Sequence, residues 1–372
     1  PIKVELNFTD FPKRKETPFF KDRHDYQTVF AYHKNQNRPL IVLYGGLGAT
    51  SHGGVNKFLY HTLHKAGFHV LSIGSPFFWR YNLGMIEDAT PGIVQRDAKT
   101  LYKAAKKSIE KAKKEYDFSI SKNMIMGYSL GALEAIYISE MDQKEKYFDF
   151  QKTIAINPPY SMVSSSKRVD SFYDSWMDLE PREQKIIEDK KWDLIFRFAD
   201  SSKDVQIQDI LKLIKSGFFS DEEAEALMGK IFHESLTSTL FVSELVNNRN
   251  LFETFPDHYS PQPGLENARK FSYMRYLRDV LLPYYQTLEP GITFEEMKYK
   301  MSLESKTDFL QNNPDIHIFH NLDDPIISRR EIRKLEEVVG NEQITLFPNG
   351  GHMGNIWYKD NIKLILKALG SS

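Results

Sequence analysis

The chain has 372 residues, of which 41% are hydrophobic and 27% are charged, and its formal net charge is −1. This length and apolar content allow one large domain with an insertion, or two domains. The near-zero charge and the lack of an aromatic-basic RNA-recognition pattern exclude a dedicated nucleic-acid binder, and the absence of cysteine excludes disulfides and thiolate metal sites.

Short apolar segments alternate with helical patterns over residues 26–160. Helices are predicted over residues 55–66 and from about residue 91 to 115, and another follows Ser129. Strands are predicted at residues 26–32, 40–44, 69–73, around Met124 and at 153–156. Residues 4–8 are expected to add an antiparallel edge. This alternation is typical of a mostly parallel sheet with helices on both faces.

A glycine-rich loop, Gly45-Gly46-Leu47-Gly48, follows the apolar strand that ends at Tyr44. Glycine-rich loops after strands can cradle phosphates. Here, however, the sequence has neither Gly-x-Gly-x-x-Gly nor a Gly-Lys-Ser/Thr ending. The pattern therefore does not favour a phosphate-binding loop.

The segment Gly127-Tyr128-Ser129-Leu130-Gly131 lies between an apolar run and a helix-forming run and has the Gly-x-Ser-x-Gly pattern of a nucleophile elbow. A sharp turn would hold Ser129 in a strained conformation with its hydroxyl above the sheet, and a Cβ at either glycine would collide with the neighbouring strand or helix. The turn also directs the Leu130 N–H toward the space where negative charge develops during acyl transfer. These features predict a nucleophilic Ser129, with a chance match in a loop as the alternative.

From about residue 161 to 310 the pattern changes to helices without intervening strands. Two capping boxes, Ser220 with Glu223 and Thr293 with Glu296, predict helix starts in this block. Large aromatic side chains are frequent here; most are expected in the core of a helical subdomain, and the rest in an apolar acyl pocket. They are Phe172, Tyr173, Trp176, Trp192, Phe196, Phe218, Phe219, Phe241 and Phe252.

Two further strands are predicted near the C-terminus, at residues 316–320 and 343–347. The first runs into Asn321-Leu322-Asp323-Asp324-Pro325, where a carboxylate can reach a histidine while the proline stiffens the loop. The second is followed by Gly350-Gly351-His352, whose glycines let an imidazole approach a serine hydroxyl without backbone crowding. An ordinary loop histidine is the alternative for His352, but the order serine, carboxylate, histidine favours a catalytic role.

With these motifs in place, the chain resembles the α/β-hydrolase family of serine hydrolases, in particular esterases and lipases with a large helical cap. The resemblance rests on the elbow at Ser129, on Asn321-Leu322-Asp323-Asp324-Pro325-Ile326 for the family's Gly-x-x-Asp-x-Val acid loop, and on Gly350-Gly351-His352. It implies the α/β-hydrolase fold, an α/β class, with a core of residues 1–160 and 311–372 and a helical cap of residues 161–310.

The resemblance also implies a catalytic triad of Ser129, Asp324 and His352. Asp324 is preferred to Asp323 because of its spacing from Asn321 and the Pro-Ile that follows, although Asn321 stands where the family usually has glycine. Asp323 would then be a solvated loop charge or a cap for the helix beginning near residue 328.

An oxyanion hole is implied by the same resemblance. Its backbone N–H donors would be those of Leu130 and of either Gly46 or Leu47. Tyr44 replaces the histidine that the family usually has before this loop, but the donors belong to the backbone, so the change is compatible with the hole.

We therefore expect a serine hydrolase that cleaves an ester or other acyl bond through an acyl-enzyme. Its substrate would be a hydrophobic small-molecule acyl compound, and it would use no cofactor. A proline-cleaving aminopeptidase of the same fold is the enzymatic alternative. It would need a carboxylate-lined recess, for which Glu222, Glu223 and Glu225 are the candidates. A non-catalytic binding protein on the same scaffold is the alternative outside enzymes.

Histidines outside the triad motif, His52, His233 and His258, could contact substrate, but no His-Glu-x-x-His or calcium-loop spacing is present, so we expect no catalytic metal. No apolar segment approaches the length needed to cross a bilayer. The chain begins with Pro1 and not Met, which suggests that an initiator or targeting segment was removed or omitted. We favour export, periplasmic or secreted, with a cytoplasmic location as the alternative.

Overall fold

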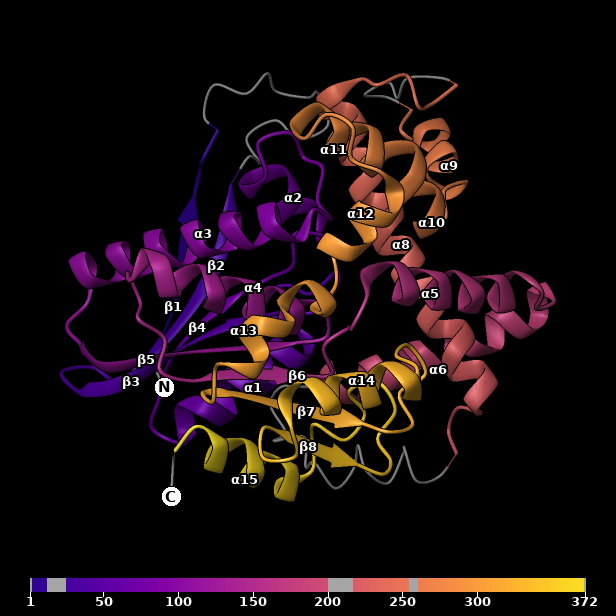
Figure 1. Ribbon diagram of the computed structural model, residues 1–372. Coiled ribbons are helices and arrows are strands. Elements are labelled where there is room, and N and C mark those ends of the chain that lie inside the picture. The colour runs from indigo at the N-terminus through magenta and orange to yellow at the C-terminus, as the bar shows by residue number, and fades with distance from the viewer. Residues whose placement is uncertain (1, 12–24, 200–216, 254–259, 371–372) are drawn as a thin grey trace.

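The computed structural model describes residues 2–11, 25–199, 217–253 and 260–370, with the side chains of residues 194–199 excepted. An eight-stranded sheet lies at its centre, with the strand order β1-β2-β4-β3-β5-β6-β7-β8 (Figure 1). Its strands are β1 Ile2–Phe8, β2 Tyr26–Tyr32, β3 Asn37–Tyr44, β4 His69–Ile73, β5 Ser119–Tyr128, β6 Thr153–Ile156, β7 Ile316–Asn321 and β8 Ile344–Phe347. From β4 to β8 all neighbours are parallel, whereas β1 and β2 form an antiparallel edge. The predicted sheet is thereby confirmed.

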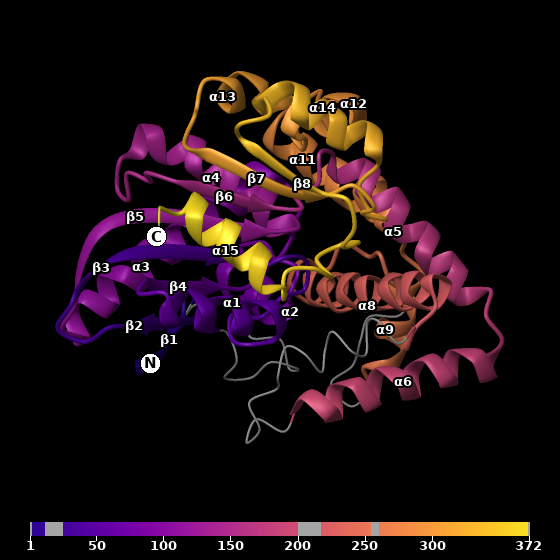
Figure 2. The same cartoon turned by 90° about the horizontal axis from the view of Figure 1, so that it is seen from below.

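Helices cover both faces of the sheet (Figures 1 and 2). On one face lie α1 Gly54–Lys65 and α15 Lys359–Ala368; on the other lie α3 Val94–Glu115, α4 Leu130–Glu145 and α14 Arg329–Val339. Successive side chains of β3 point to opposite faces of the sheet. Leu40 and Val42 pack in the core beneath α3 and α4, and Ile41 and Leu43 pack in the core beneath α1 and α15. Each is fully buried, and burial of such a side chain contributes about 1.5–3 kcal/mol.

The remaining helices form a block beyond the carboxyl ends of the parallel strands (Figures 1 and 2). It contains α5 Met162–Met177, α6 Pro181–Ala199, α8 Asp221–Asn247, α9 Gln262–Arg269, α10 Tyr273–Tyr276, a π-helical turn Leu277–Leu281, α11 Leu282–Leu288, α12 Phe294–Lys300 and a 3₁₀ turn Leu303–Lys306. The last helix before β7, α13 Thr307–Gln311, instead contacts α14. Both predicted capping boxes are present, at the starts of α8 and α12.

The two ends of this block meet beside the sheet. Ser161 and Ser302 form an antiparallel bridge, and the Leu303 N–H donates to the Tyr160 carbonyl at 2.8 Å. The block therefore leaves and rejoins the sheet-containing part of the chain at one place, as an inserted segment does.

Most predicted elements lie where the sequence placed them, and strands 26–32, 69–73 and 153–156 agree in both bounds. Helix α2, Trp79–Met85, was not predicted. This helix has no side-chain N-cap, and it contains Gly84, which lies close to the backbone of Tyr26. Because glycine and a missing cap both disfavour a helix, tertiary contacts stabilise α2 and local propensity does not. Within the described residues, no helix is long and apolar enough to cross a membrane.

Candidate active site

Ser129 lies at the turn between β5 and α4 and has φ 53° and ψ −127°, a conformation that L-residues rarely adopt. Its flanking glycines explain how the turn closes. A Cβ on Gly127 would lie 2.0 Å from the Gly131 carbonyl oxygen, and a Cβ on Gly131 would lie 2.5 Å from the carbonyl oxygens of Tyr44 and Gly45. The Ser129 N–H also donates to the Ile156 carbonyl at 2.8 Å, which attaches the turn to β6. The strained elbow and both steric conflicts expected from the sequence are present.

A chain of hydrogen bonds joins Ser129, His352 and Asp324. The Ser129 Oγ lies 2.8 Å from His352 Nε2, and His352 Nδ1 lies 2.8 Å from Asp324 Oδ2. The His352 side chain is 7% exposed and that of Asp324 is fully buried. If Nδ1 carries the imidazole proton, Nε2 is free to accept the hydroxyl proton of the serine. The structure thus brings together three residues that are far apart in the sequence.

Several donors surround the Asp324 carboxylate. Asn157 Nδ2 donates to Oδ2 at 2.9 Å, and the Ile326 N–H donates to Oδ1 at 2.9 Å. Burial alone would raise the pKa of Asp324. The charge and hydrogen bond of His352, together with the charge of His320 and the backbone donor, outweigh burial and hold that pKa below its usual value. The carboxylate is therefore ionised near neutral pH and can orient an imidazole.

Sequence reasoning assigned no role to Asn157. It follows β6, adopts φ 47° and precedes two prolines, Pro158 and Pro159. An asparagine between a strand end and a proline pair is a common turn signal, so only its position opposite Asp324 reveals the second function.

Asp323 is exposed, as expected for a loop charge, but it also holds the histidine loop and does not cap the helix. Its Oδ2 accepts from the Gly350 N–H at 3.0 Å and its Oδ1 from the Gly351 N–H at 2.8 Å. The helix cap is Ser328, which forms a capping box with Glu331. Because neighbouring side chains at a strand end project in different directions, one carboxylate reaches the His352 ring and the other reaches the backbone before it.

Asn321, which replaces the usual glycine, also holds the histidine loop. Its Nδ2 donates to the Gly351 carbonyl at 2.8 Å and to Asn355 Oδ1 at 3.0 Å, and Asn355 Nδ2 donates back to Asn321 Oδ1 at 2.6 Å. Its φ is not positive, so the position has no steric need for glycine. The departure from the family pattern thus adds support to the loop.

The candidate oxyanion donors differ in their surroundings. Leu47 and Leu130 line the same cavity as Ser129. The Gly46 N–H is hydrogen-bonded to the Tyr128 phenol. Burial raises the pKa of this phenol, and the hydrogen bond from Gly46 lowers it. The Gly46 N–H therefore already has a partner, and Leu47 is the other candidate donor. Tyr44 is fully buried in the core.

No family model and no curated protein matches the chain. A Legionella pneumophila protein described as a hydrolase superposes with a TM-score of 0.50 at 11% identity, over 92% of this chain and 84% of its own. A fungal esterase from Rhizomucor miehei gives 0.48 at 12% identity, over 100% and 84%, and a Penicillium α/β-hydrolase gives 0.46 at 10% identity, over 100% and 97%.

One fold is indicated by three observations, namely the sheet order, the elbow between β5 and α4, and the first of these superpositions. The chain has the α/β-hydrolase fold.

The cavity above Ser129 has a volume of about 50 Å³. Pockets that bury drug-sized ligands measure roughly 300–1,000 Å³, so the cavity accommodates only a small group as it stands. Its walls come from the sheet loops, from α5 and α8, and from the acid and histidine loops. The lining residues are Leu47, Ser129, Leu130, Pro159, Met162, Ser165, Ser166, Val169, Phe232, Tyr273, Ile326, Ile327 and His352.

None of the aromatic residues proposed from the sequence lines this cavity. Phe172, Trp176, Phe241 and Phe252 are buried in the helical packing, and Trp192 is 49% exposed. Tyr173, Phe218 and Phe219 pack elsewhere in the block, and the Phe196 side chain lies outside the described residues. Phe232 and Tyr273 are the aromatic residues at the α/β-hydrolase cavity, and their spacing in the sequence carried no signal that distinguishes them from core residues.

Two of the other proposed substrate contacts, His52 and His233, do not line the Ser129 cavity. His233 stacks on Tyr173 with ring centroids 3.6 Å apart, and its Nε2 lies 3.0 Å from the Arg269 carbonyl oxygen. Burial lowers the pKa of His233, which is consistent with a neutral, structural ring. His52 is exposed, and His258 lies outside the described residues. In the described part of the chain, no three or more His, Asp or Glu side chains lie close enough together to hold a metal ion.

The carboxylates proposed for a peptidase do not line the cavity either. Glu223 closes the α8 capping box and pairs with Lys190 at 2.6 Å, and Glu222 accepts from the Ser220 hydroxyl at 2.9 Å. Among the described lining residues of the cavity, none is Asp or Glu.

Proposed function

We propose that this α/β-hydrolase is a serine hydrolase that cleaves an ester or other acyl bond through an acyl-enzyme. The proposal rests on the hydrogen-bonded chain from Ser129 Oγ through His352 to the buried Asp324 carboxylate, with 2.8 Å at each step. A serine on a strained elbow, a histidine within reach and a carboxylate behind it are the groups that acyl transfer requires.

In the proposed reaction, His352 Nε2 takes the Ser129 hydroxyl proton as Oγ bonds to the acyl carbon. The carbonyl oxygen becomes an oxyanion, which accepts hydrogen bonds from the N–H groups of Leu130 and Leu47. When the carbonyl re-forms, the bond to the leaving alcohol breaks and His352 returns the proton to that oxygen. Water then repeats the sequence with Ser129 as the leaving group. Asp324 holds the imidazole and stabilises its charged form throughout.

The helical block over residues 161–310 is proposed to act as a cap that selects the acyl group. Met162, Val169 and Phe232 come from this block and face Ser129 across an apolar cavity. A hydrophobic acyl group suits these walls, and the small volume favours short chains unless the block shifts.

A fluorophosphonate probe and a panel of chromogenic esters test the proposed activity. The wild type should be labelled at Ser129 and should hydrolyse at least one short-chain ester. Ser129→Ala should abolish both signals, while Ser165→Ala, which removes another cavity hydroxyl that has no histidine partner, should keep the label. Persistent labelling in folded Ser129→Ala, or an unlabelled and inactive wild type, would overturn the proposal.

A further inference from the structure

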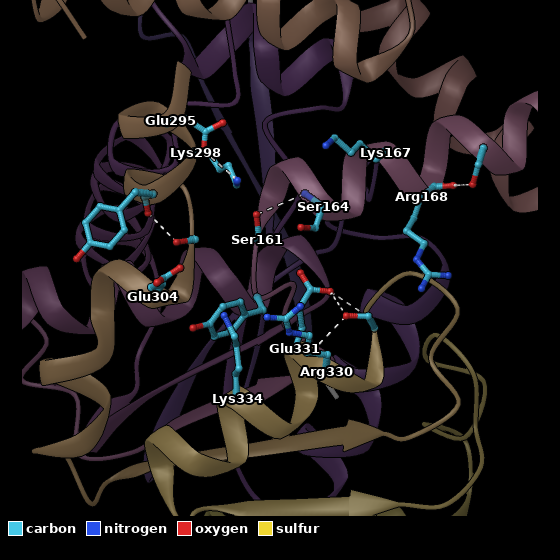
Figure 3. A pocket seen from close by; sticks show the side chains of 15 residues that line it. Ser161, Ser164, Lys167, Arg168, Glu295, Lys298, Glu304, Arg330, Glu331 and Lys334 are labelled. Carbon is cyan, nitrogen blue, oxygen red and sulfur yellow. Dashed lines mark hydrogen bonds and ion pairs between the residues drawn. The ribbon is translucent and has the colours of Figure 1, made fainter. Parts of the chain in front are cut away.

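A second, larger cleft lies on the far side of α5 from the catalytic cavity. Its volume is about 710 Å³, within the usual range for ligand pockets. The walls are formed by α5, α12 and α14 together with the segments that connect the helical block to the sheet (Figure 3). The cleft therefore spans two parts of the structure that are separated in sequence by more than a hundred residues.

Helix α5 has a different face toward each hollow. Met162, Ser166 and Val169 line the catalytic cavity, whereas Ser164, Lys167 and Arg168 line the cleft. These two sets follow the i, i+3, i+4 spacing of opposite helix faces. The cleft is thus separate from the reacting groups but shares one wall element with them.

Positive charge predominates in the cleft. Its basic side chains are Lys167, Arg168, Lys298, Arg330 and Lys334, and its acidic ones are Glu295, Glu304 and Glu331. Figure 3 shows the basic groups on both walls, with Lys167 and Arg168 on α5 and Arg330 and Lys334 on α14.

Two of the three carboxylates are already engaged. Glu295 pairs with Lys298 at 3.0 Å, and Glu331 accepts from the hydroxyl and N–H of Ser328 in the α14 capping box. Glu304 is the remaining acidic group of the cleft.

Four cations are left after these pairings, namely Lys167, Arg168, Arg330 and Lys334. Within the described residues none of the four forms an ion pair, and Lys334 lies over the Tyr160 ring at 5.7 Å. An adjoining hollow of about 440 Å³ extends the basic surface along α14. It shares Arg330 and Lys334 with the cleft and adds Arg329, Arg333 and one acidic residue, Glu337.

Glu304 and Glu331 keep their charges, so the cleft has five basic against three acidic side chains, and this excess of positive charge favours an anion between the two walls. The chain as a whole has a net charge of −1, so the cleft is a local concentration and not part of a generally basic surface. Arginine guanidinium groups bind phosphate through paired N–H donors, and the hydroxyl of Ser164 adds a neutral donor at the wall.

We propose that this cleft binds a small molecule that carries two or more phosphate groups. A concave site of this volume suits a compact ligand, and several unpaired cations on two walls suit more than one phosphate. The inference does not rest on the proposed hydrolase activity, because binding is measured directly.

Isothermal titration of the full chain with inorganic pyrophosphate and tripolyphosphate, at about 0.1 M salt, tests the site. We expect saturable binding to the wild type, and at least about tenfold weaker binding to the double variant Arg330→Gln/Lys334→Gln, as expected for the loss of charge-assisted phosphate contacts. The control Lys99→Gln/Lys113→Gln removes two exposed charges of α3 outside the cleft and should bind within about twofold of wild type. Thermal unfolding of each variant verifies folding.

Absence of saturable binding to the wild type, or equal weakening in both double variants, would overturn the proposal. A parallel arm uses vesicles of phosphatidylcholine with and without phosphatidic acid, because a lipid headgroup offers the same phosphate chemistry. Binding to anionic vesicles without binding to pyrophosphate would also contradict a small-molecule site. Pyrophosphate binding that anionic vesicles do not displace supports it.

Discussion

Asp323 and Asp324 are adjacent in sequence but support different parts of the site. Asp324 contacts the His352 ring, while Asp323 accepts two N–H groups from the loop that carries the ring. One carboxylate therefore controls the imidazole's tautomer and charge, and the other controls where the imidazole lies.

Amide replacement separates these roles. Asp324→Asn keeps the shape but favours the wrong imidazole tautomer, so we expect kcat to fall on the order of 10⁴, as in a serine protease with the equivalent change. Asp323→Asn keeps one acceptor oxygen and places an NH₂ against the second N–H, so we expect a loss of about 10-fold to 100-fold, typical of groups that orient a functional residue. Ester hydrolysis by both variants, with circular dichroism as the folding check, gives the comparison. A greater loss in Asp323→Asn than in Asp324→Asn would reverse the assignment.

Helices α5 and α8 set the shape of the catalytic cavity. Phe232 of α8 faces Ser129 across this cavity, whereas the preceding side chain in the sequence, Ile231, is 46% exposed. A single helix thus provides both a cavity residue and a solvent-facing control at adjacent positions.

Phe232→Ala should enlarge the cavity and shift preference toward longer acyl chains. The ratio of kcat/KM for octanoate to that for acetate esters is expected to rise about tenfold, within the 1–3 kcal/mol that hydrophobic pockets discriminate. Ile231→Ala should leave the ratio within about twofold of wild type. If the ratio is unchanged in a folded Phe232→Ala protein, this wall does not govern acyl length and the proposed role of the block in selection loses its main support.

Stability of the whole molecule depends on carboxyl groups buried between α3 and α4. Asp97 accepts from the Gly92 N–H at 2.6 Å, yet burial raises its pKa to about 7. Glu134, directly after the elbow, has both carboxyl oxygens buried without a hydrogen-bond partner among the described residues. Burial, followed by the charge of Asp97, raises the pKa of Glu134 well above its usual value. Neutral forms of both acids therefore suit the core.

Asp97 predicts a specific loss of stability with rising pH. Its pKa is higher in the folded state than in the unfolded state, so its contribution is complete below about pH 4 and disappears as the pH rises through about 7. Relative to the non-titrating Asp97→Asn, the free energy of unfolding of the wild type should fall by on the order of 2 kcal/mol between pH 5 and pH 8. Because the charge of Asp97 also raises the pKa of Glu134, the difference between the two proteins reports the Asp97 carboxyl together with its effect on Glu134.

Urea unfolding at the two pH values measures this difference. Asp117→Asn, at an exposed position, is the matched control and should follow the wild type. If the free energies of unfolding of the wild type and of Asp97→Asn change equally between pH 5 and pH 8, the buried carboxyl does not take up the expected proton.

Much of the fold was predictable because its signals are local. Buried parallel strands are short apolar runs, which predict the sheet. The Gly-x-Ser-x-Gly pattern by itself predicts a strained turn between a strand and a helix, which predicts α4 and the position of Ser129. The order of Ser129, Asp324 and His352 along the chain was also sufficient to expect their meeting, because parallel strands end at one edge of a sheet.

Contacts between distant segments carry no such local signal. Asn157 opposite Asp324, Asp323 beneath the histidine loop, and Asn321 paired with Asn355 became recognisable only when separate strand ends were brought side by side. The aromatic residues of the helical block illustrate the same limit. A large apolar side chain at helical spacing is equally suited to a core or to a cavity wall, and the packing of α5 and α8 over the sheet decided that Phe232 lines the cavity while Phe172 and Trp176 do not.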